Sequence, residues 1–196
     1  MSSPGYGRMR VVAEQRREPL VPNGVMGMLI FVLTELMLFA GLISAFTIIR
    51  SSAIVWPPPG QPRLPFEATA FNTTVLLLSG AALVWTRRRF ERSRAAARRP
   101  MLLAIALGAF FVVVQGAEWV AMIGQGLTLT SSTLGSFFYL TVGLHGLHAV
   151  AALILLGVTY RRLRRGWLAS SQLGTAEVLW YFVVGVWPVL WLVVYR

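Results

Sequence analysis

A long hydrophobic segment, from Gly24 to Ile49, contains a single ionisable side chain, that of Glu35. As an α-helix this segment would rise about 39 Å, more than the hydrocarbon thickness of about 30 Å of a typical bilayer, so we expect it to span a membrane. A charged carboxyl group at that depth costs at least about 2.5 kcal/mol, so Glu35 is expected to face protein or water. Two interpretations fit this position: a proton-active or partner-facing group, or a neutral carboxyl group bonded to a neighbouring helix.

The chain as a whole has the composition of an integral membrane protein, with 56% hydrophobic and 13% charged residues. Four more apolar segments are long enough to cross a bilayer: Ala68–Thr86, Met101–Ile123, Thr133–Tyr160 and Thr175–Tyr195. The sequence therefore predicts an all-α bundle of five transmembrane helices over residues 24–196. Residues 1–23 have neither an apolar core nor a small-residue cleavage pattern, so we interpret them as a cytoplasmic tail and not as a signal peptide.

The net charge of +11 reflects an uneven distribution of arginine. Besides the tail, the second and fourth connections between spans are rich in arginine: Arg87, Arg88, Arg89, Arg92, Arg94, Arg98, Arg99, Arg161, Arg162, Arg164 and Arg165. The positive-inside rule then predicts a cytoplasmic N-terminus and an outer C-terminus. We expect these arginines to set the topology and to contact anionic lipid headgroups, so nucleic acid is not an expected partner.

The residue types exclude several classes of chemistry. The chain has no cysteine, which excludes disulfides, thiolate metal sites and a cysteine nucleophile. It also lacks a glycine-rich phosphate loop and a Ser-His-acid arrangement in a soluble domain. We therefore predict no catalytic residue in this chain.

Two of the predicted spans carry polar pairs. Gln115 and Glu118 lie three residues apart in the third span, and His145 and His148 lie three apart in the fourth, so each pair shares a helix face. Such groups serve either as a proton relay or as hydrogen bonds between helices. The second interpretation is favoured for Glu118 and the histidines.

The two histidines are a weak basis for a haem or metal site. Because both lie on one helix, they cannot ligate a haem iron from its two faces. A zinc or copper site would need further ligands, for which the candidates are Glu35, Glu118 and Glu177. We predict that this chain binds no metal and no redox cofactor.

The first outer connection, from Arg50 to Glu67, is rich in proline, which fixes φ and removes backbone donors. It is predicted to be rigid and extended. Trp56 in this connection and Glu67 at the mouth of the second span suit a membrane interface, where an indole buries its face and keeps its N–H in water. From the residues alone, both are interpreted as interfacial anchors.

Four motifs occur together in one order: TELMLFAGLISAF, WPPPGQPRLPFEATAFNTTVLLLSGAALVW, QGAEW and GSFFYLTVGLHGLHAV. In this order they resemble subunit III of the haem-copper terminal oxidases. That subunit commonly has seven spans, and this chain resembles a five-span form without the first two. The resemblance implies an accessory subunit beside subunit I, which holds the haems and copper, with no redox cofactor of its own.

The resemblance also implies roles for single residues. Glu35 matches the family's membrane-buried, carbodiimide-reactive glutamate. Trp56 and Glu67 match positions where the family holds phospholipids in a cleft, although the two helices that form the other wall of that cleft are missing here. Glu118, His145 and His148 match positions that serve packing and hydrogen bonding in the family, whereas the fifth and last span departs from the family pattern.

In the last span, Glu177, Trp180 and Tyr181 fit the start of the family's final helix. The family's following W-H-F-V-D motif is replaced by residues 182–186, FVVGV, so its His and Asp are missing. Pro188 also falls within this span and is expected to kink it. The departures in this helix therefore predict that the chain belongs to a divergent branch of the family.

Together these features predict the cofactor-free subunit III of a bacterial cytochrome c oxidase in the cell inner membrane. Its expected partners are subunits I and II and membrane lipids, with cytochrome c as the substrate of the complex. The expected role is to stabilise subunit I and to support proton uptake. The alternatives are the equivalent subunit of a quinol oxidase or nitric oxide reductase complex, or a stand-alone proton-coupled transporter, which the lack of an evident inverted repeat disfavours.

Overall fold

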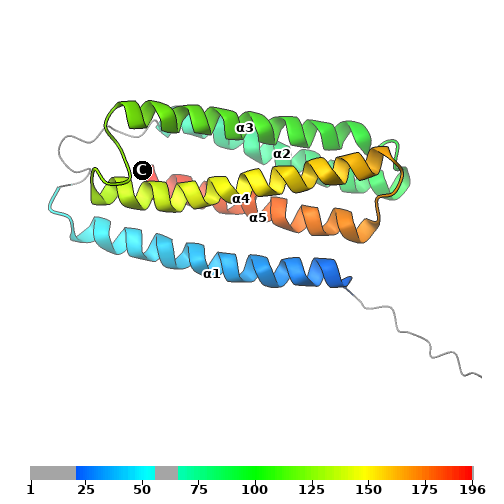
Figure 1. Cartoon of the computed structure of the whole chain (residues 1–196), viewed down its shortest axis with the longest axis horizontal. Coiled ribbons are helices and arrows are strands. Elements are labelled where there is room, and N and C mark those ends of the chain that lie inside the picture. Colours follow the sequence, from blue (N-terminus) through cyan, green and yellow to red (C-terminus); the bar gives the residue numbers. More distant parts are fainter. Residues whose placement is uncertain (1–20, 56–65, 196) are drawn as a thin grey trace, which may run out of the picture.

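A computed structural model describes residues 21–55 and 66–195. These residues form five helices and no strand, which confirms the predicted all-α bundle: α1 (Asn23–Ser52), α2 (Phe66–Arg92), α3 (Arg98–Gly124), α4 (Thr133–Arg164) and α5 (Ser170–Val194). Each helix is long and apolar enough to cross a membrane. Successive helices run in opposite directions along the bundle (Figure 1).

The ends of the helices follow from local sequence. After α3, Gly126 has φ of 91°, and the N–H of Leu127 donates to the Met122 carbonyl at 3.0 Å. Gly166 ends α4 in the same way with φ of 80°. Only glycine adopts this left-handed conformation at little cost. The backbone N–H groups that follow the helix then donate to carbonyl groups of its last turn, which have no partner within the helix. At the start of α4, the Ser132 side chain accepts a hydrogen bond from the N–H of Gly135 at 3.0 Å.

Three helices extend beyond the predicted spans into the arginine-rich connections; α3 begins at Arg98 and not at Met101. α2 continues to Arg92 and α4 to Arg164, because arginine is a good helix former even where the apolar pattern has ended. An ion pair between Arg87 and Glu91, one turn apart at 3.0 Å, supports the end of α2. α5 continues as one helix through Pro188, so the proline does not end the last span.

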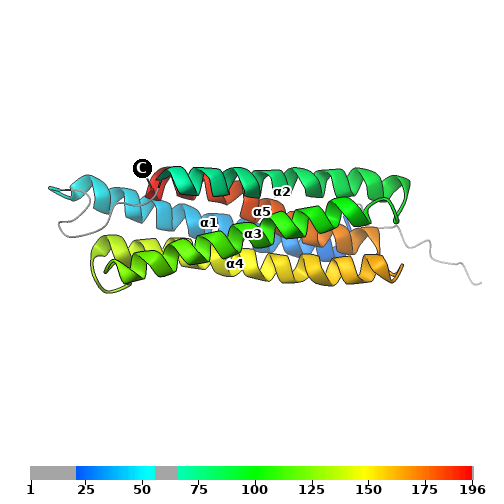
Figure 2. The same ribbon diagram turned by 90° about the horizontal axis from the view of Figure 1, so that it is seen from above.

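The bundle is arranged around α5. This helix contacts α1, α2 and α4, while α3 packs against α2 and α4 (Figures 1 and 2). Among the described helices, α1 contacts only α4 and α5. α1 therefore lies at the side of the bundle opposite α3.

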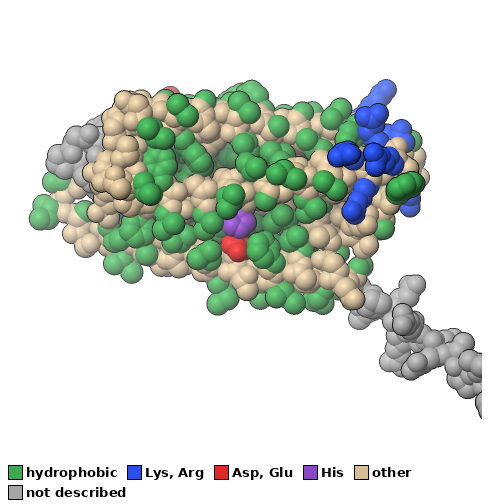
Figure 3. Space-filling view, viewed as in Figure 1, with side chains coloured by type: hydrophobic (Ala, Val, Ile, Leu, Met, Phe, Trp, Pro, Cys, Tyr) green, Lys and Arg blue, Asp and Glu red, His purple; other side chains and the backbone are tan. Residues whose placement is uncertain are grey.

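Bulky aromatic side chains of α5 fill the core. Trp180 and Trp187 are completely buried. A Cβ atom on Gly108 of α3 would lie only 2.6 Å from the Trp180 ring, so glycine at that position lets the indole pack directly against the α3 backbone. The arginine side chains visible in Figure 3 gather at the end of the molecule where α1 begins, whereas Arg50 lies at the other end, in the last turn of α1.

Candidate functional site

Glu35 of α1 lies beside His148 of α4. Its Oε2 is 3.2 Å from His148 Nε2, an ion-pair distance, although the alignment falls short of a hydrogen bond. The two side chains are only 16% and 12% exposed. Figure 3 shows an imidazole and a carboxylate side by side midway along this face, among hydrophobic side chains. The sequence predicted a partner for Glu35 but not which one.

The second ring nitrogen of His148, Nδ1, is bonded within α4. Nδ1 lies 2.8 Å from the Leu144 carbonyl oxygen, which can only accept, so Nδ1 must carry a hydrogen. Nε2 then carries a hydrogen only if the imidazole is cationic. A hydrogen bond in the contact with Glu35 would need one proton, either on the carboxyl group or on Nε2.

Three phenylalanine rings surround His148. The ring centroids of Phe39 and Phe182 lie 5.8 Å from the imidazole centroid, both edge-on, and that of Phe31 lies 6.2 Å away. These rings come from α1 and α5 and limit the access of water. In such surroundings, ionic and hydrogen-bonding contacts of the pair are stronger than in water.

His145 lies one turn before His148 but in a different environment. It is 1% exposed, and the Trp187 ring lies 5.0 Å away at a shallow angle of 31°. Neither ring nitrogen has a hydrogen-bond partner among the described residues. The predicted role of His145 as a hydrogen bond between helices is therefore not visible in the described part of the chain.

Gln115 and Glu118 belong to a separate network that joins α2, α3 and the end of α5. Gln115 Nε2 donates to Glu118 Oε2 and to the Tyr195 hydroxyl, both at 3.0 Å. From α2, Thr69 donates to Glu118 Oε2 at 3.1 Å. Asn72 donates to the Phe111 carbonyl at 3.1 Å and to Gln115 Oε1 at 3.4 Å. The network fastens α2 to α3.

Three members of this network, Thr69, Asn72 and Tyr195, were not among the residues singled out from the sequence. Asn72 carried the clearest signal, since an amide in an apolar span needs a partner. The signal for Thr69 and Tyr195 was weak, because threonine can bond its own helix and tyrosine is common at membrane interfaces.

Glu177 lies towards the arginine-rich end of the bundle. Its Oε2 is 3.4 Å from Arg87 Nη1, so the pair joins α5 to α2. The Glu177 side chain is 10% exposed and that of Arg87 is 35% exposed. Arg87 also binds Glu91 and thus links two carboxylates. This site is separate from the contact between Glu35 and His148.

The remaining predicted residues do not join these groups. Glu67 lies in the first turn of α2 and is exposed. Trp56 and the proline-rich connection lie outside the described residues. Within the described ranges, no three His, Cys, Asp or Glu side chains come together as metal ligands would.

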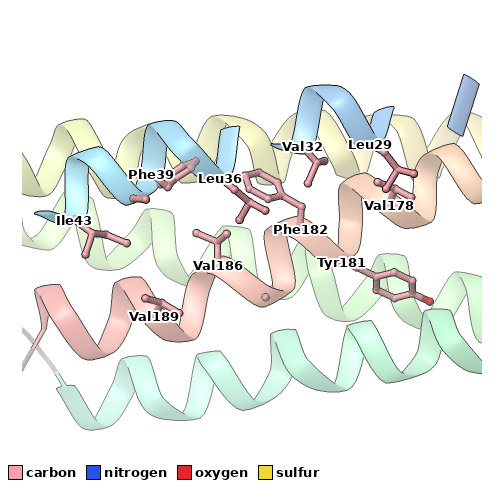
Figure 4. Close-up of a pocket in the computed structure, with 12 residues that line it drawn as sticks. Leu29, Val32, Leu36, Phe39, Ile43, Val178, Tyr181, Phe182, Val186 and Val189 are labelled. Atoms are coloured by element: carbon pink, nitrogen blue, oxygen red, sulfur yellow. The ribbon is translucent and has the colours of Figure 1, made fainter. Parts of the chain in front are cut away.

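A groove of about 570 Å³ runs between α1 and α5, beside the contact between Glu35 and His148. Leu29, Val32, Leu36 and Ile43 of α1 line it together with residues of α5 (Figure 4). Phe182 borders the groove and also packs against His148. The groove has the apolar lining that a lipid chain would need.

Two of the sequence motifs interlock between α3 and α4. A Cβ atom on Gly146, between the two histidines, would lie 2.6 Å from the Trp119 ring. Trp119 directly follows Glu118, so the aromatic end of one motif packs on the glycine of the other. Close packing on small residues is a common way to join membrane helices.

Comparisons with known proteins show the family to which this chain belongs. The family model described as cytochrome c oxidase subunit III matches residues 13–196. Cytochrome c oxidase subunit 3 of Pelomedusa subrufa is 31% identical over 188 residues, which cover 90% of this chain and 71% of the relative. The subunit of Ovis aries is 31% identical and that of Mus musculus 30%, each with the same coverage. The chain is a multi-pass membrane protein that belongs to the cytochrome c oxidase subunit III family.

Proposed function

We propose that this chain is the accessory subunit III of a bacterial cytochrome c oxidase, lodged in the cell inner membrane beside subunits I and II. The haems and copper belong to the partner subunits, and this chain carries no redox cofactor. Its role is to stabilise subunit I and to support proton uptake from the cytoplasmic side. Family membership is the observation that carries this proposal.

The surface of α1 supports a role in assembly. Only Phe39 and Phe46 of this helix are buried within the chain. On its outer side, Leu33 is 60%, Met37 71% and Ile48 66% exposed. A continuous apolar face of this kind is suited to contact with lipid or with another membrane subunit. We assign this face to the contact with subunit I.

The contact between Glu35 and His148 supports a role in proton supply. It can hold one proton at mid-membrane, at the edge of the least covered helix. The arginines at the end where α1 begins support our assignment of that end to the cytoplasm, by the positive-inside rule. Glu35 then lies in the half of α1 nearer the proposed cytoplasmic end, on the helix that we assign to the contact with subunit I.

The remaining predicted residues complete the proposal. The groove between α1 and α5 is the place we assign to a bound phospholipid chain. For Glu67, and for Trp56, which lies outside the described residues, we propose the contact with lipid that the family resemblance implies. Gln115, Glu118 and Glu177 are assigned structural roles, because each is held by groups of neighbouring helices.

The first experiment is purification of the tagged chain from its native membrane in mild detergent, followed by a haem spectrum and mass spectrometry. Recovery of subunits I and II with a-type haem and copper is expected. A subunit I with iron in place of copper would instead identify a nitric oxide reductase complex, and oxidation of quinol by the complex would identify a quinol oxidase. Isolation of a haem-free chain that transports protons in proteoliposomes would contradict the proposal.

Variants at Glu35 test the proton role. Glu35→Ala should shorten the period over which the oxidase stays active or weaken the retention of this subunit. Glu35→Gln keeps a hydrogen-bonding group beside His148 but no ionisable acid, so it should assemble normally and slow proton uptake. Thr34→Ala is the control, since this exposed hydroxyl bonds only the carbonyl of Phe31 in its own helix. Unchanged assembly, proton uptake and turnover lifetime in both Glu35 variants would refute the role.

A further inference from the structure

A pocket of about 330 Å³ lies at the end of α4, and arginine side chains line it. These are Arg161, Arg164 and Arg165, whose spacing of three and four residues places them on one face of the helix. Arg162, which lies between them in the sequence, does not line the pocket. The pocket belongs to the arginine-rich end of the molecule (Figure 3) and concentrates three positive charges in one place.

None of these three guanidinium groups has an acidic partner in the described part of the chain. Both Glu91 and Glu177, the carboxylates found towards this end, bind Arg87 of α2 instead. Like charges three or four residues apart on a helix repel each other. An anion from outside the described residues would therefore relieve this repulsion.

The carbonyl groups that end α4 do not need these side chains either. The first three of its last four carbonyl groups accept hydrogen bonds from backbone N–H groups that follow. The last, that of Arg164, accepts from Arg98 Nη2 at 3.4 Å. Arg94 Nη1 donates to the Gly166 carbonyl at 2.7 Å. The donors that line the pocket are thus left for another molecule, and Arg94 and Arg98 add positive charge beside them.

The chemistry of the lining indicates what that molecule carries. A guanidinium group presents its N–H donors in a planar fork that matches the oxygens of a phosphate group. A single phosphate with one negative charge would leave two of the three positive charges uncompensated. At about 30 Å³ for each water-sized atom, the five heavy atoms of a phosphate group fill at most about 150 Å³, so two such groups fit the pocket.

The position of the pocket indicates the source of the phosphates. The apolar part of α4 ends at Tyr160, directly before the first arginine of the pocket. Trp167 follows the helix and is 78% exposed. Exposed indoles of membrane proteins gather at the level of the lipid headgroups. A lipid headgroup can therefore reach these arginines while its chains stay in the membrane.

We propose that Arg161, Arg164 and Arg165 bind an anionic lipid whose headgroup carries two linked phosphates. This is one selective site, beyond the general contact with anionic headgroups that the sequence predicts for the arginines together. It shares no lining residue with the groove between α1 and α5. It is independent of the proposed proton role and of the assembly to which the chain belongs.

The test compares cardiolipin, whose headgroup has two linked phosphates, with phosphatidylglycerol, which has one. The full chain is placed in phosphatidylcholine nanodiscs that contain either cardiolipin or twice the molar amount of phosphatidylglycerol, so that the total charge is equal. Native mass spectrometry counts the lipids that stay bound. We expect saturable retention of one cardiolipin and a clear preference for it over phosphatidylglycerol. Equal retention of the two lipids at equal charge would overturn the proposal.

The first variant removes the charge of the pocket by combining Arg161→Gln, Arg164→Gln and Arg165→Gln. Binding of cardiolipin should weaken about hundredfold, at roughly fivefold for each arginine, and the preference for cardiolipin should disappear. A variant that keeps the preference of the wild type would contradict the site.

The matched control removes three charges from the same end of the molecule but outside the pocket. It combines Arg88→Gln, Arg92→Gln and Arg99→Gln. The net charge of the two triple variants is the same, so general attraction to an anionic membrane weakens in both. Only the pocket variant should lose the preference for cardiolipin. Loss of the preference in both variants would show a diffuse effect of charge and overturn the proposal.

A lysine variant covers the case in which loss of charge disturbs membrane insertion. Arg161→Lys, Arg164→Lys and Arg165→Lys together keep the positive charge that sets topology but remove the planar fork. Binding of cardiolipin should still weaken several-fold. Unchanged binding would contradict recognition by guanidinium groups.

Soluble pyrophosphate distinguishes the lipid from a soluble source of the same chemistry. It carries two linked phosphates but no apolar chains that hold it at the membrane. At a concentration equal to that of cardiolipin it should leave the bound lipid in place. Complete displacement of cardiolipin would show that the pocket takes a soluble diphosphate and would overturn the assignment to a lipid.

Discussion

Helices α1 and α5 are both strongly apolar, yet α5 lies at the centre of the bundle and α1 lies at its edge. Only 11% of an 18-residue apolar stretch of α1 is buried by the rest of the chain, against 56% of such a stretch of α5, although α1 is the more apolar of the two. In a membrane the outer side of a helix is as apolar as its packed side. The comparison shows that hydrophobicity identifies a span but does not identify the centre of the bundle.

The side chains that distinguish α5 are large aromatic groups with a polar atom. Trp180 Nε1 donates to the Ser79 hydroxyl at 3.2 Å, and Trp187 Nε1 donates to the Thr73 hydroxyl at 2.8 Å. Both bonds join α5 to α2. Core position in this protein therefore depends on ring packing and on hydrogen bonds between helices, both of which survive transfer from water to lipid.

The largest expected effect is that of Trp180→Ala. The substitution empties a completely buried site against Gly108 and removes the bond to Ser79. We expect a loss of about 3 kcal/mol or more in the free energy of unfolding. The measurement is unfolding of the full chain in mixed micelles of increasing SDS content, followed by circular dichroism.

Trp167→Ala provides the matched control. Trp167 lies in the connection between α4 and α5 and is 78% exposed, so its loss should change stability by less than about 0.5 kcal/mol. If both tryptophan variants unfolded at the same SDS fraction, the central position of α5 would be wrong.

An intermediate effect is expected for Asn72→Leu in α2. The substitution keeps the number and branching of the side-chain heavy atoms but removes the bonds to the Phe111 carbonyl and to Gln115. Hydrogen bonds between membrane helices contribute about 0.6 kcal/mol on average and up to about 1.7 kcal/mol, so a loss in this range is expected in the same assay. Thr74→Val is the control, because that exposed hydroxyl bonds only its own helix, at the Ala70 carbonyl. Equal stability of Asn72→Leu and Thr74→Val would show that the network does not fasten α2 to α3.

The five spans could be predicted from the sequence because lipid imposes a length and an apolar composition on every helix. The position of each helix end was less predictable. α2 and α4 continue into arginine-rich segments, where hydropathy falls but helix propensity remains. The bonded pair Gln115 and Glu118 was also accessible, since a spacing of three residues on one helix fixes their proximity.

The contacts between helices could not be predicted in the same way. Glu35 meets His148, and Arg87 meets Glu177, across long stretches of sequence. Such pairs depend on how each helix is rotated about its axis, and this rotation is set by the packing of many side chains at once. The sequence identified Glu35 as a residue in need of a partner, but only the packed bundle identifies the imidazole that meets it.

The smallest expected effect on the subunit itself is that of Met37→Ala in α1, and it tests the other side of the comparison. Met37 is 71% exposed, so the isolated chain should lose less than about 0.5 kcal/mol of stability. If this face of α1 contacts subunit I, the same substitution should reduce the fraction of subunit III that is retained when the complex is washed with detergent. Leu102→Ala on α3, at a side chain that is 51% exposed, is the control and should leave retention unchanged. Equal retention of both variants would show that α1 faces lipid, because an apolar face that meets only lipid loses no protein contact when a methionine is shortened.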